Sequence, residues 1–237
     1  MRIKGRDPHA RLRKTPVTTD DLNLSTELDD TLMPEEATPR MPTKHLKKKK
    51  VDHARLKTIV RELLVALGED PDREGLQDTP RRIANFWRDF IEYDPGKLDT
   101  VFSSVRHNQM VAVTGMRVWS MCEHHMLPFW CDVSVAYIAE DKVLGLSKFA
   151  RIAHKNAHAL SLQEKLVADI QSDIMEYLDT KNVAVMAKGE HLCMTMRGIR
   201  TPHRMISSAL EGQFLDPHTR AEFLSLVNAA SNPRADG

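Results

Sequence analysis

The sequence has 237 residues, which is enough for one domain with extensions or for two small domains. Hydrophobic residues make up 41% of it and charged residues 28%, so the chain can bury a sizeable core in water. The formal net charge of +1 argues against a strong overall attraction to nucleic acid or to membrane surfaces, and no apolar run approaches the roughly 18 residues of a membrane span.

The cysteines and the N-terminal sequence favour a cytoplasmic location. Cys122, Cys131 and Cys193 are odd in number and cannot form a closed set of disulfides, which suits a reducing compartment. The first residues, MRIKGRDPHARLRK, are basic but lack the apolar segment of a secretory signal. We therefore expect a cytoplasmic protein.

Residues 1–50 are predicted to form a disordered basic and polar tail. They contain several prolines, many Thr and Asp residues and no sustained apolar period. The lysine run Lys47–Lys50 is compatible with a contact to nucleic acid or phosphates, but a solvated tail is the simpler interpretation. The globular pattern begins at Val51.

Two amphipathic helices are expected over residues 51–99, an N-terminal helical region. The first lies within 51–68 and stops at Gly68, and its apolar stripe consists of Leu56, Ile59, Val60, Leu63, Leu64 and Leu67. The second has Thr79 as its N-cap and Pro80 at its first position, where the missing N–H costs nothing. Its predicted buried face consists of Ile83, Phe86, Trp87 and Phe90.

The rest of the chain predicts an α+β fold. Strands are expected over 109–121 and 130–140, and in the second of them Val133, Val135 and Tyr137 alternate onto one face. A helix with Ser147 as N-cap and a longer helix over 160–178 come next, followed by strands over 182–199 and 204–212. This order is typical of an antiparallel sheet backed by helices.

The stretch SMCEHHMLPF, residues 120–129, is the strongest indication of chemistry. It places four side chains that bind metals or carry protons in consecutive positions: Cys122, Glu123, His124 and His125. Buried Cys and His do occur in ordinary cores, but four such residues in a row are hard to explain by packing. The spacing of Cys122 and His125 lets two ligands from one tight turn reach a single ion.

A second polar group is expected on the strand GEHLCMTMR. Alternation along a strand places His191, Cys193, Thr195 and Arg197 on one face. Cys193 then supplies a third sulfur or nitrogen ligand, as in a catalytic zinc site that keeps one position open. A closed structural site would need a fourth ligand, for which the candidates are His124, His191 and Cys131, and spacing alone leaves both kinds of site open.

Five segments together resemble GTP cyclohydrolase I in order and approximate spacing. They are ALGEDPDREGLQDTPRRIA, SMCEHHMLPF, LGLSKFARI, LQEKL and EHLCMTMRGI, and the similarity runs from about Val51 to Phe214. The resemblance implies the tunnelling fold, with the order β-β-α-α-β-β, in a catalytic domain over residues 100–237. It also implies a homodecamer of two stacked rings.

The resemblance implies zinc-dependent conversion of GTP and water to 7,8-dihydroneopterin triphosphate and formate. The metal ligands it implies are Cys122, His125 and Cys193. Proton transfer falls to His124 and His191, since the pKa of an imidazole lies near neutral pH, and Ser147 matches a serine near the ribose. The product feeds folate, biopterin or 7-deazaguanine pathways, and the sequence leaves open which of them is supplied.

Substrate binding is implied for six further residues. Gln163 and Glu164 match the pair that reads the guanine edge, although SLQE, residues 161–164, is also a capping box that would begin a helix. Guanidinium groups fit phosphate bidentately. The implied triphosphate clamp consists of Lys148, Arg151 and Arg197, with Arg82 reaching in from a neighbouring subunit.

The chain departs from the common family pattern at four positions. Asn85 stands where a Lys is frequent, Ala159 and Ser161 where Arg and Gln are frequent, and Cys131 where small residues such as Gly are commoner. Cys131 is expected to be a small buried hydrophobe. These departures bear on affinity and assembly and leave the implied ligands in place.

Two functions of another class are weaker. A non-catalytic zinc-dependent guanine-nucleotide-binding module would tolerate loss of the proton-transfer residues or of Glu164, yet all are present. Nucleic-acid binding would depend on Lys47–Lys50 alone, because acidic residues slightly outnumber basic ones over 51–237.

Overall fold

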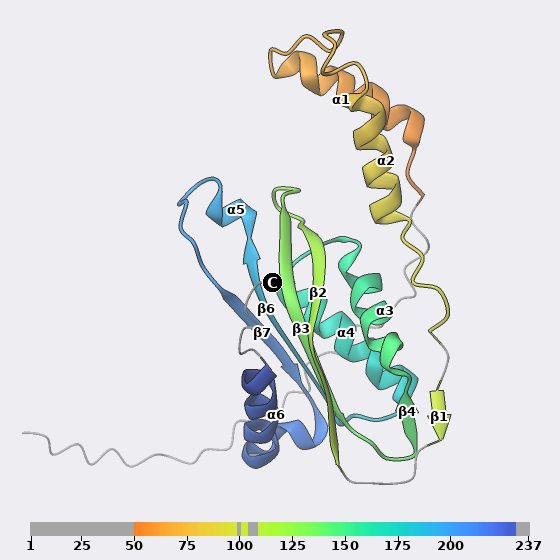
Figure 1. Ribbon diagram of the computed structural model, residues 1–237, viewed down its shortest axis with the longest axis vertical. Coiled ribbons are helices and arrows are strands. Elements are labelled where there is room, and N and C mark those ends of the chain that lie inside the picture. Colours follow the sequence, from red (N-terminus) through yellow and green to blue (C-terminus); the bar gives the residue numbers. More distant parts are fainter. Residues whose placement is uncertain (1–49, 99–100, 104–108, 231–237) are drawn as a thin grey trace, which may run out of the picture. The chain divides into compact units, whose positions relative to one another are not determined.

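A computed structural model describes residues 50–98, 101–103 and 109–230 (Figure 1). The tail expected over residues 1–50 lies outside this part of the chain except for Lys50, so its disorder stays a prediction. Among the described residues, no helix combines the length and the apolar character needed to cross a membrane.

The two expected N-terminal helices are present and pack against each other. Helix α1 spans His53–Ala66 and helix α2 spans Thr79–Ile91. The carboxylate of Asp52 caps α1 by accepting from the Arg55 backbone N–H at 2.9 Å. The N-cap of α2 is Asp78, so Thr79 is already helical, one position away from the prediction.

The apolar stripe of α1 is only partly covered. Val60 and Leu64 are buried and Leu56 is half-buried, whereas Ile59, Leu63 and Leu67 are 46%, 51% and 68% exposed. A single chain therefore leaves part of the predicted stripe exposed to solvent. An amphipathic helix ordinarily buries such a stripe, so this side of α1 is suited to an intermolecular contact.

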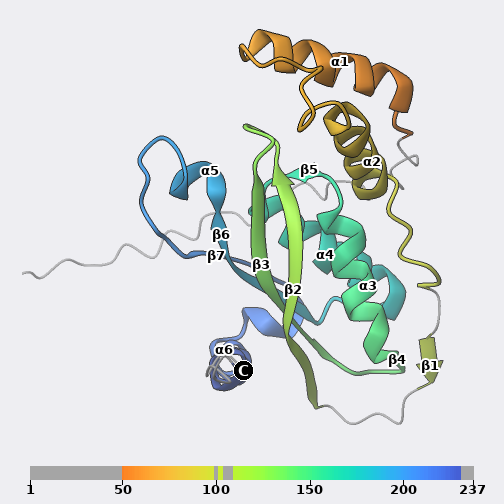
Figure 2. The same ribbon diagram turned by 45° about the horizontal axis from the view of Figure 1, so that its top comes forward.

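The central element is a five-stranded sheet in the order β5-β2-β3-β6-β7 (Figure 2). Its long strands pair antiparallel, and the short β5 pairs parallel with β2. A separate antiparallel pair is formed by β1 (Val101–Ser103) and β4 (Lys142–Leu144). The strands of the main sheet are β2 (Met110–Cys122), β3 (Pro128–Ile138), β5 (Leu160–Ser161), β6 (Val183–His191) and β7 (Met205–Leu210).

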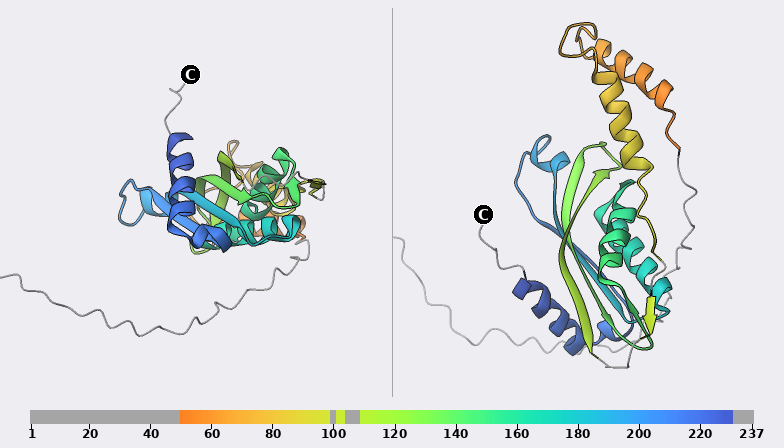
Figure 3. Two further views of the ribbon diagram at one scale, coloured as in Figure 1. Left: turned by 90° about the horizontal axis from the view of Figure 1, so that it is seen from below. Right: turned by 45° about the vertical axis from the view of Figure 1, so that its right-hand side comes forward.

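Helices cover both faces of this sheet (Figure 3). On one face, α3 (Leu146–Ala157) and α4 (Gln163–Leu178) pack on the alternating residues of β3, as predicted, and form the larger core. The residues of β3 in that core are Phe129, Cys131, Val133, Val135 and Tyr137. The other face carries a turn of 3-10 helix, Gly212–Leu215, and α6, Pro217–Ala230.

The smaller core on the second face was not predicted. Phe214, Phe223 and Val227 pack there against Ala136 and Ile138 of β3. Strand β3 is therefore buried on both sides in its second half. The α+β class and the order of the main elements are confirmed, with α6 as an addition.

Three local predictions are wrong. The strand expected over 182–199 ends at His191 and continues as the short helix α5, Leu192–Thr195, so the alternation does not reach Cys193. Helix α3 begins at Leu146 with Gly145 as N-cap, which makes Ser147 its second residue. The Ser161 hydroxyl donates to the Leu162 carbonyl, so the capping box does not form at α4.

Candidate metal centre and active site

The turn between β2 and β3 positions two of the expected ligands. Cys122 is the last residue of β2, and the turn is closed by hydrogen bonds from Met126 N to Cys122 O at 2.8 Å and from Cys122 N to Leu127 O at 2.9 Å. Met126 has φ of 53°, a left-handed conformation that is uncommon for a residue with a side chain. This tight turn brings the side chains of Cys122 and His125 together.

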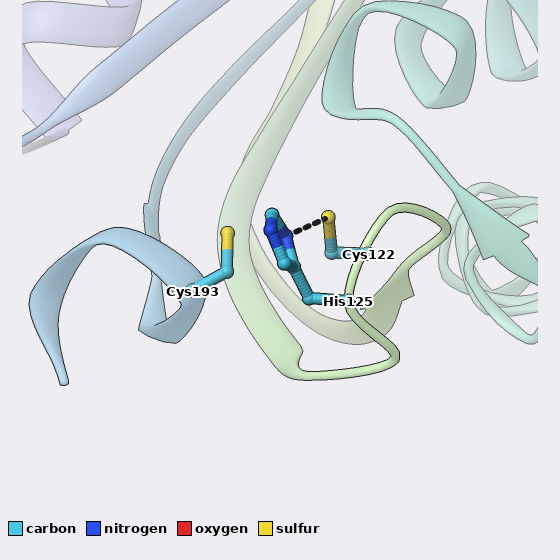
Figure 4. A group of neighbouring side chains, drawn as sticks. All are labelled: Cys122, His125 and Cys193. Atoms are coloured by element: carbon cyan, nitrogen blue, oxygen red, sulfur yellow. Dashed lines mark hydrogen bonds between the residues drawn. The ribbon is translucent and has the colours of Figure 1, made fainter. Parts of the chain in front are cut away.

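Strand β6 brings the third ligand to the same end of the sheet. Its last residue, His191, lies opposite Phe129 at the start of β3, immediately beyond the turn. The chain then enters α5, which places Cys193 beside the turn (Figure 4). The helical geometry brings Cys193 into the cluster, where the prediction had used a strand.

The ligand atoms of Cys122, His125 and Cys193 all lie within 4.8 Å of one another. The Cys122 Sγ and His125 Nδ1 atoms are 4.0 Å apart. Tetrahedral zinc with bonds of about 2.0–2.3 Å separates such atoms by about 3.5–3.8 Å, so a small contraction completes the site. Within the described segments, this is the one group of three or more His, Cys, Asp or Glu side chains so arranged.

The chemistry of these donors fits a cation. The pKa of the Cys193 thiol is raised, first by burial and then by the neighbouring Cys122 sulfur, while the Arg197 guanidinium opposes this. Two adjacent sulfurs repel each other as thiolates, and a divalent metal removes that repulsion. Two sulfurs and one imidazole nitrogen form a donor set that zinc accepts.

His124 lies in the same turn but outside the ligand cluster. Its side chain is exposed, and its ring stands almost perpendicular to that of His125, with the ring centroids 6.2 Å apart. Cys131 is also outside the cluster and fully buried, as expected, and burial raises the pKa of its thiol to about 12. Neither residue completes a closed four-ligand site in this structure.

His191 is buried beside the cluster. Its ring stacks on Phe129 with centroids 4.5 Å apart and planes 6° from parallel, and its Nε2 is 3.1 Å from Gln163 Oε1. Burial lowers the pKa of His191, the nearby His203 lowers it further, and Glu164 opposes the shift. These surroundings favour a neutral imidazole.

Adjacent residues at the start of α4 have different environments. The Gln163 side chain is completely buried, and its Nε2 lies 3.1 Å from each of three acceptors: Ala187 O, Met205 O and Ser207 Oγ. Glu164 is exposed in the first turn of the helix. Of the two residues predicted to read guanine, Glu164 is therefore exposed to solvent, whereas the Gln163 amide is not.

Two predicted phosphate ligands on α3 hold a backbone segment. Lys148 is buried, and its Nζ donates to the Lys97 carbonyl at 2.6 Å. Arg151 donates to the Pro95 carbonyl. Gly96, between Pro95 and Lys97, has φ of +70°, and a Cβ at this position would collide with the Arg151 guanidinium. Residues 95–97 therefore lie against these two cations.

The remaining predicted site residues are exposed. Arg197 follows α5 and is close enough to the cluster to affect the Cys193 pKa. Ser147 lies in the first turn of α3. Arg82 lies on α2 with its guanidinium 3.7 Å from the Asp78 carboxylate. The role of Arg82 at a neighbouring subunit stays a prediction.

Sequence reasoning missed Phe129 and Gly189. Phe129 supports the ring of His191, and Gly189 lies opposite Cys131 where a Cβ would come within 2.8 Å of Gln163 Oε1. A glycine inside a strand marks a close approach of another group, and this was the available indication. Nothing comparable marked Phe129, because an aromatic residue in a strand is ordinary.

Comparisons with known proteins point to one family. The profile of the GTP cyclohydrolase I family matches residues 56–228. GTP cyclohydrolase 1 of Sulfurihydrogenibium sp. is 42% identical over 182 residues, covering 76% of this chain and 97% of that protein. The Rhodopirellula baltica protein of the same name is 40% identical over 216 residues, covering 89% and 94%. That of Aquifex aeolicus is 42% identical over 179 residues, covering 75% and 97%. The family profile spans most of this chain and the relatives are matched over nearly their whole length, so the chain belongs to the GTP cyclohydrolase I family.

Proposed function

We propose that this protein is a zinc-dependent GTP cyclohydrolase I, which converts GTP and water to 7,8-dihydroneopterin triphosphate and formate. The observation that carries the proposal is the convergence of Cys122, His125 and Cys193 beside the buried His191, at one end of the sheet. Family membership supports the reaction, and the cluster of candidate ligands supports this end of the sheet as its site.

The zinc ion would be held by the two thiolates and the His125 imidazole. When bound by these three residues, the ion would supply Lewis acidity and would activate water at neutral pH. His124 and His191 lie outside the ligand set and are the residues proposed to move protons. The burial that lowers the His191 pKa supports a neutral imidazole able to accept a proton.

Recognition of GTP is proposed for charged residues around the cluster. The exposed Glu164 carboxylate is suited to accept from N1–H and the 2-amino group of guanine. Lys148, Arg151 and Arg197 are proposed to bind the triphosphate, and Arg82 to reach a neighbouring site. Lys148 has three N–H donors, so its bond to the Lys97 carbonyl leaves donors for phosphate.

We also propose that the active form is a homo-oligomer, a decamer in the arrangement that the family resemblance implies. Exposed apolar side chains support it, because a single chain leaves them in water. On α1, at its C-cap and on α2, these side chains are Ile59, Leu63, Val65, Leu67 and Phe86. A cytoplasmic location is part of the same proposal, since zinc binding requires the cysteines in reduced form.

The alternative is a guanine-nucleotide-binding module that holds zinc without catalysis. Incubating the purified protein with GTP and zinc distinguishes the two. We expect stoichiometric release of formate and a pterin product that fluoresces after oxidation. Tight GTP binding without formate release, at full zinc occupancy, would instead establish the binding module.

A further inference from the structure

The Gln163 amide has a fixed orientation. Its Nε2 faces two backbone carbonyls, of Ala187 and Met205, and the Ser207 hydroxyl, each at 3.1 Å. A rotated amide would set its oxygen against both carbonyl oxygens, which repel it. The two N–H groups are therefore committed to the protein, and Oε1 is directed to His191.

The packing around Oε1 leaves little freedom. The Gln163 side chain has no exposed surface. A Cβ on Gly189 would come within 2.7 Å of the Cys131 Cβ and 2.8 Å of Gln163 Oε1, so a larger residue at 189 would push this oxygen away. On the other side, the nearly parallel Phe129 ring holds the plane of His191.

This arrangement determines which imidazole nitrogen carries the proton. An amide oxygen only accepts hydrogen bonds, so the Nε2 atom 3.1 Å away must donate. In the neutral imidazole the lone pair is then on Nδ1. We propose that Gln163 is a positioning residue that fixes His191 as the Nε2–H tautomer and leaves Nδ1 to exchange protons with the substrate. This inference rests on the proposed function and replaces guanine reading by Gln163, leaving Glu164 for that role.

The chain contains a matched control. Gln171 lies two turns further along α4, is also buried, and donates from Nε2 to the Val183 carbonyl at 2.9 Å. Met has a volume similar to that of Gln, so Gln163→Met and Gln171→Met each remove a buried amide from the same helix with little change in packing volume. The two glutamines differ in that the Gln163 amide is hydrogen-bonded to the His191 ring, whereas the Gln171 amide donates to the Val183 carbonyl.

Steady-state kinetics separates the two roles of Gln163. In Gln163→Met we expect kcat to fall about 10- to 100-fold while KM for GTP changes less than about twofold. In Gln171→Met kcat should stay within about twofold, at a similar loss of thermal stability. A guanine reader would instead raise KM and weaken the preference for GTP over inosine triphosphate, which lacks the 2-amino group. That result would overturn the inference.

A double-mutant cycle tests whether Gln163 acts through His191. In the His191→Ala background, adding Gln163→Met should lower the residual rate by less than about twofold. The dissociation constant of GTP, measured by calorimetry on these slow variants, should also be the same with and without Gln163→Met. A full additional loss of rate, or weaker GTP binding, would show that Gln163 acts independently of His191.

Folding and function have separate readouts. Circular dichroism and zinc content establish that each variant is folded and loaded, and if Gln163→Met does not fold, the shorter Gln163→Asn carries the test with the same expectation. An active parent protein with an unimpaired Gln163 variant overturns the inference alone. Absence of formate release from the unsubstituted protein overturns the proposed function and the inference with it.

Discussion

Cys193 and His191 are two positions apart in the chain, yet they face different partners. Cys193 lies on α5 with its sulfur among the candidate metal ligands, whereas His191 ends β6 and is held between Phe129 and Gln163. Their variants should therefore fail in different ways. Measuring zinc content and formate release for each variant distinguishes a metal ligand from a proton-transfer residue.

We expect Cys193→Ser to lose both zinc and turnover. His191→Ala should keep about one zinc per chain and lose turnover by about 10²- to 10⁴-fold, the usual contribution of a positioned acid or base. Metal content by emission spectrometry and formate release measure the two properties separately. If His191→Ala removed zinc as fully as Cys193→Ser, the assignment of an open site with three ligands would be wrong.

The Cys131 thiol should be chemically inert in the folded protein. Burial raises its pKa from 9.0 to about 12, so below pH 12 it is mainly the neutral thiol and lacks the reactive thiolate. At pH 8 the shift lowers the thiolate fraction about a thousandfold. Mass spectrometry after a timed iodoacetamide treatment should find Cys131 unmodified in native protein and modified after denaturation. Rapid native labelling would contradict this.

Among single residues, the candidate metal ligands could be predicted from the sequence better than the residues that position them. The spacing of Cys122 and His125 within one turn was sufficient to predict that they meet. The contact of Gln163 with His191 joins residues 28 positions apart and depends on the packing of α4 against β6. Local sequence patterns do not indicate contacts between residues so far apart in the chain, so the proposed role of Gln163 could not be predicted.

Among the elements, strand β3 shows what periodicity can and cannot predict. The alternation of Val133, Val135 and Tyr137 predicted the face covered by α3 and α4. The sequence made no prediction for the opposite face, where Ala136 and Ile138 pack in one core with residues of α6. Helix α6 has few buried residues, Phe223 and Val227, so its apolar pattern was too short to identify the helix from sequence.

The packing of α6 can be tested with one aromatic residue. Phe223 is fully buried and meets Phe214 edge-on, with centroids 5.8 Å apart. Phe223→Ala should lower the free energy of unfolding by about 3–5 kcal/mol, through lost burial and the cavity left behind. The control is Phe102→Ala, since Phe102 is 55% exposed and should cost under about 1 kcal/mol. Denaturant unfolding that ranked the two in reverse would contradict the described core.

For the whole molecule, activity is predicted to require assembly. The candidate residues come from separate elements, and Arg82 is proposed to serve a neighbouring subunit. Introducing a charge on the exposed apolar side of α1, as in Leu63→Glu, should give smaller assemblies with at least tenfold lower turnover. The exposed polar control Thr58→Glu should do neither. Sedimentation and formate release are measured on the same samples, and a fully active monomer would refute the prediction.

If the protein assembles through the uncovered side of α1, as proposed, its stability depends on the protein concentration. If the apolar stripe is buried only between copies, folding and association form one equilibrium, and dilution shifts it toward the unfolded chain. The unfolding midpoint is then a function of protein concentration, and it should rise with each tenfold increase in protein. An unfolding midpoint measured at one protein concentration would then depend on that concentration as well as on the sequence.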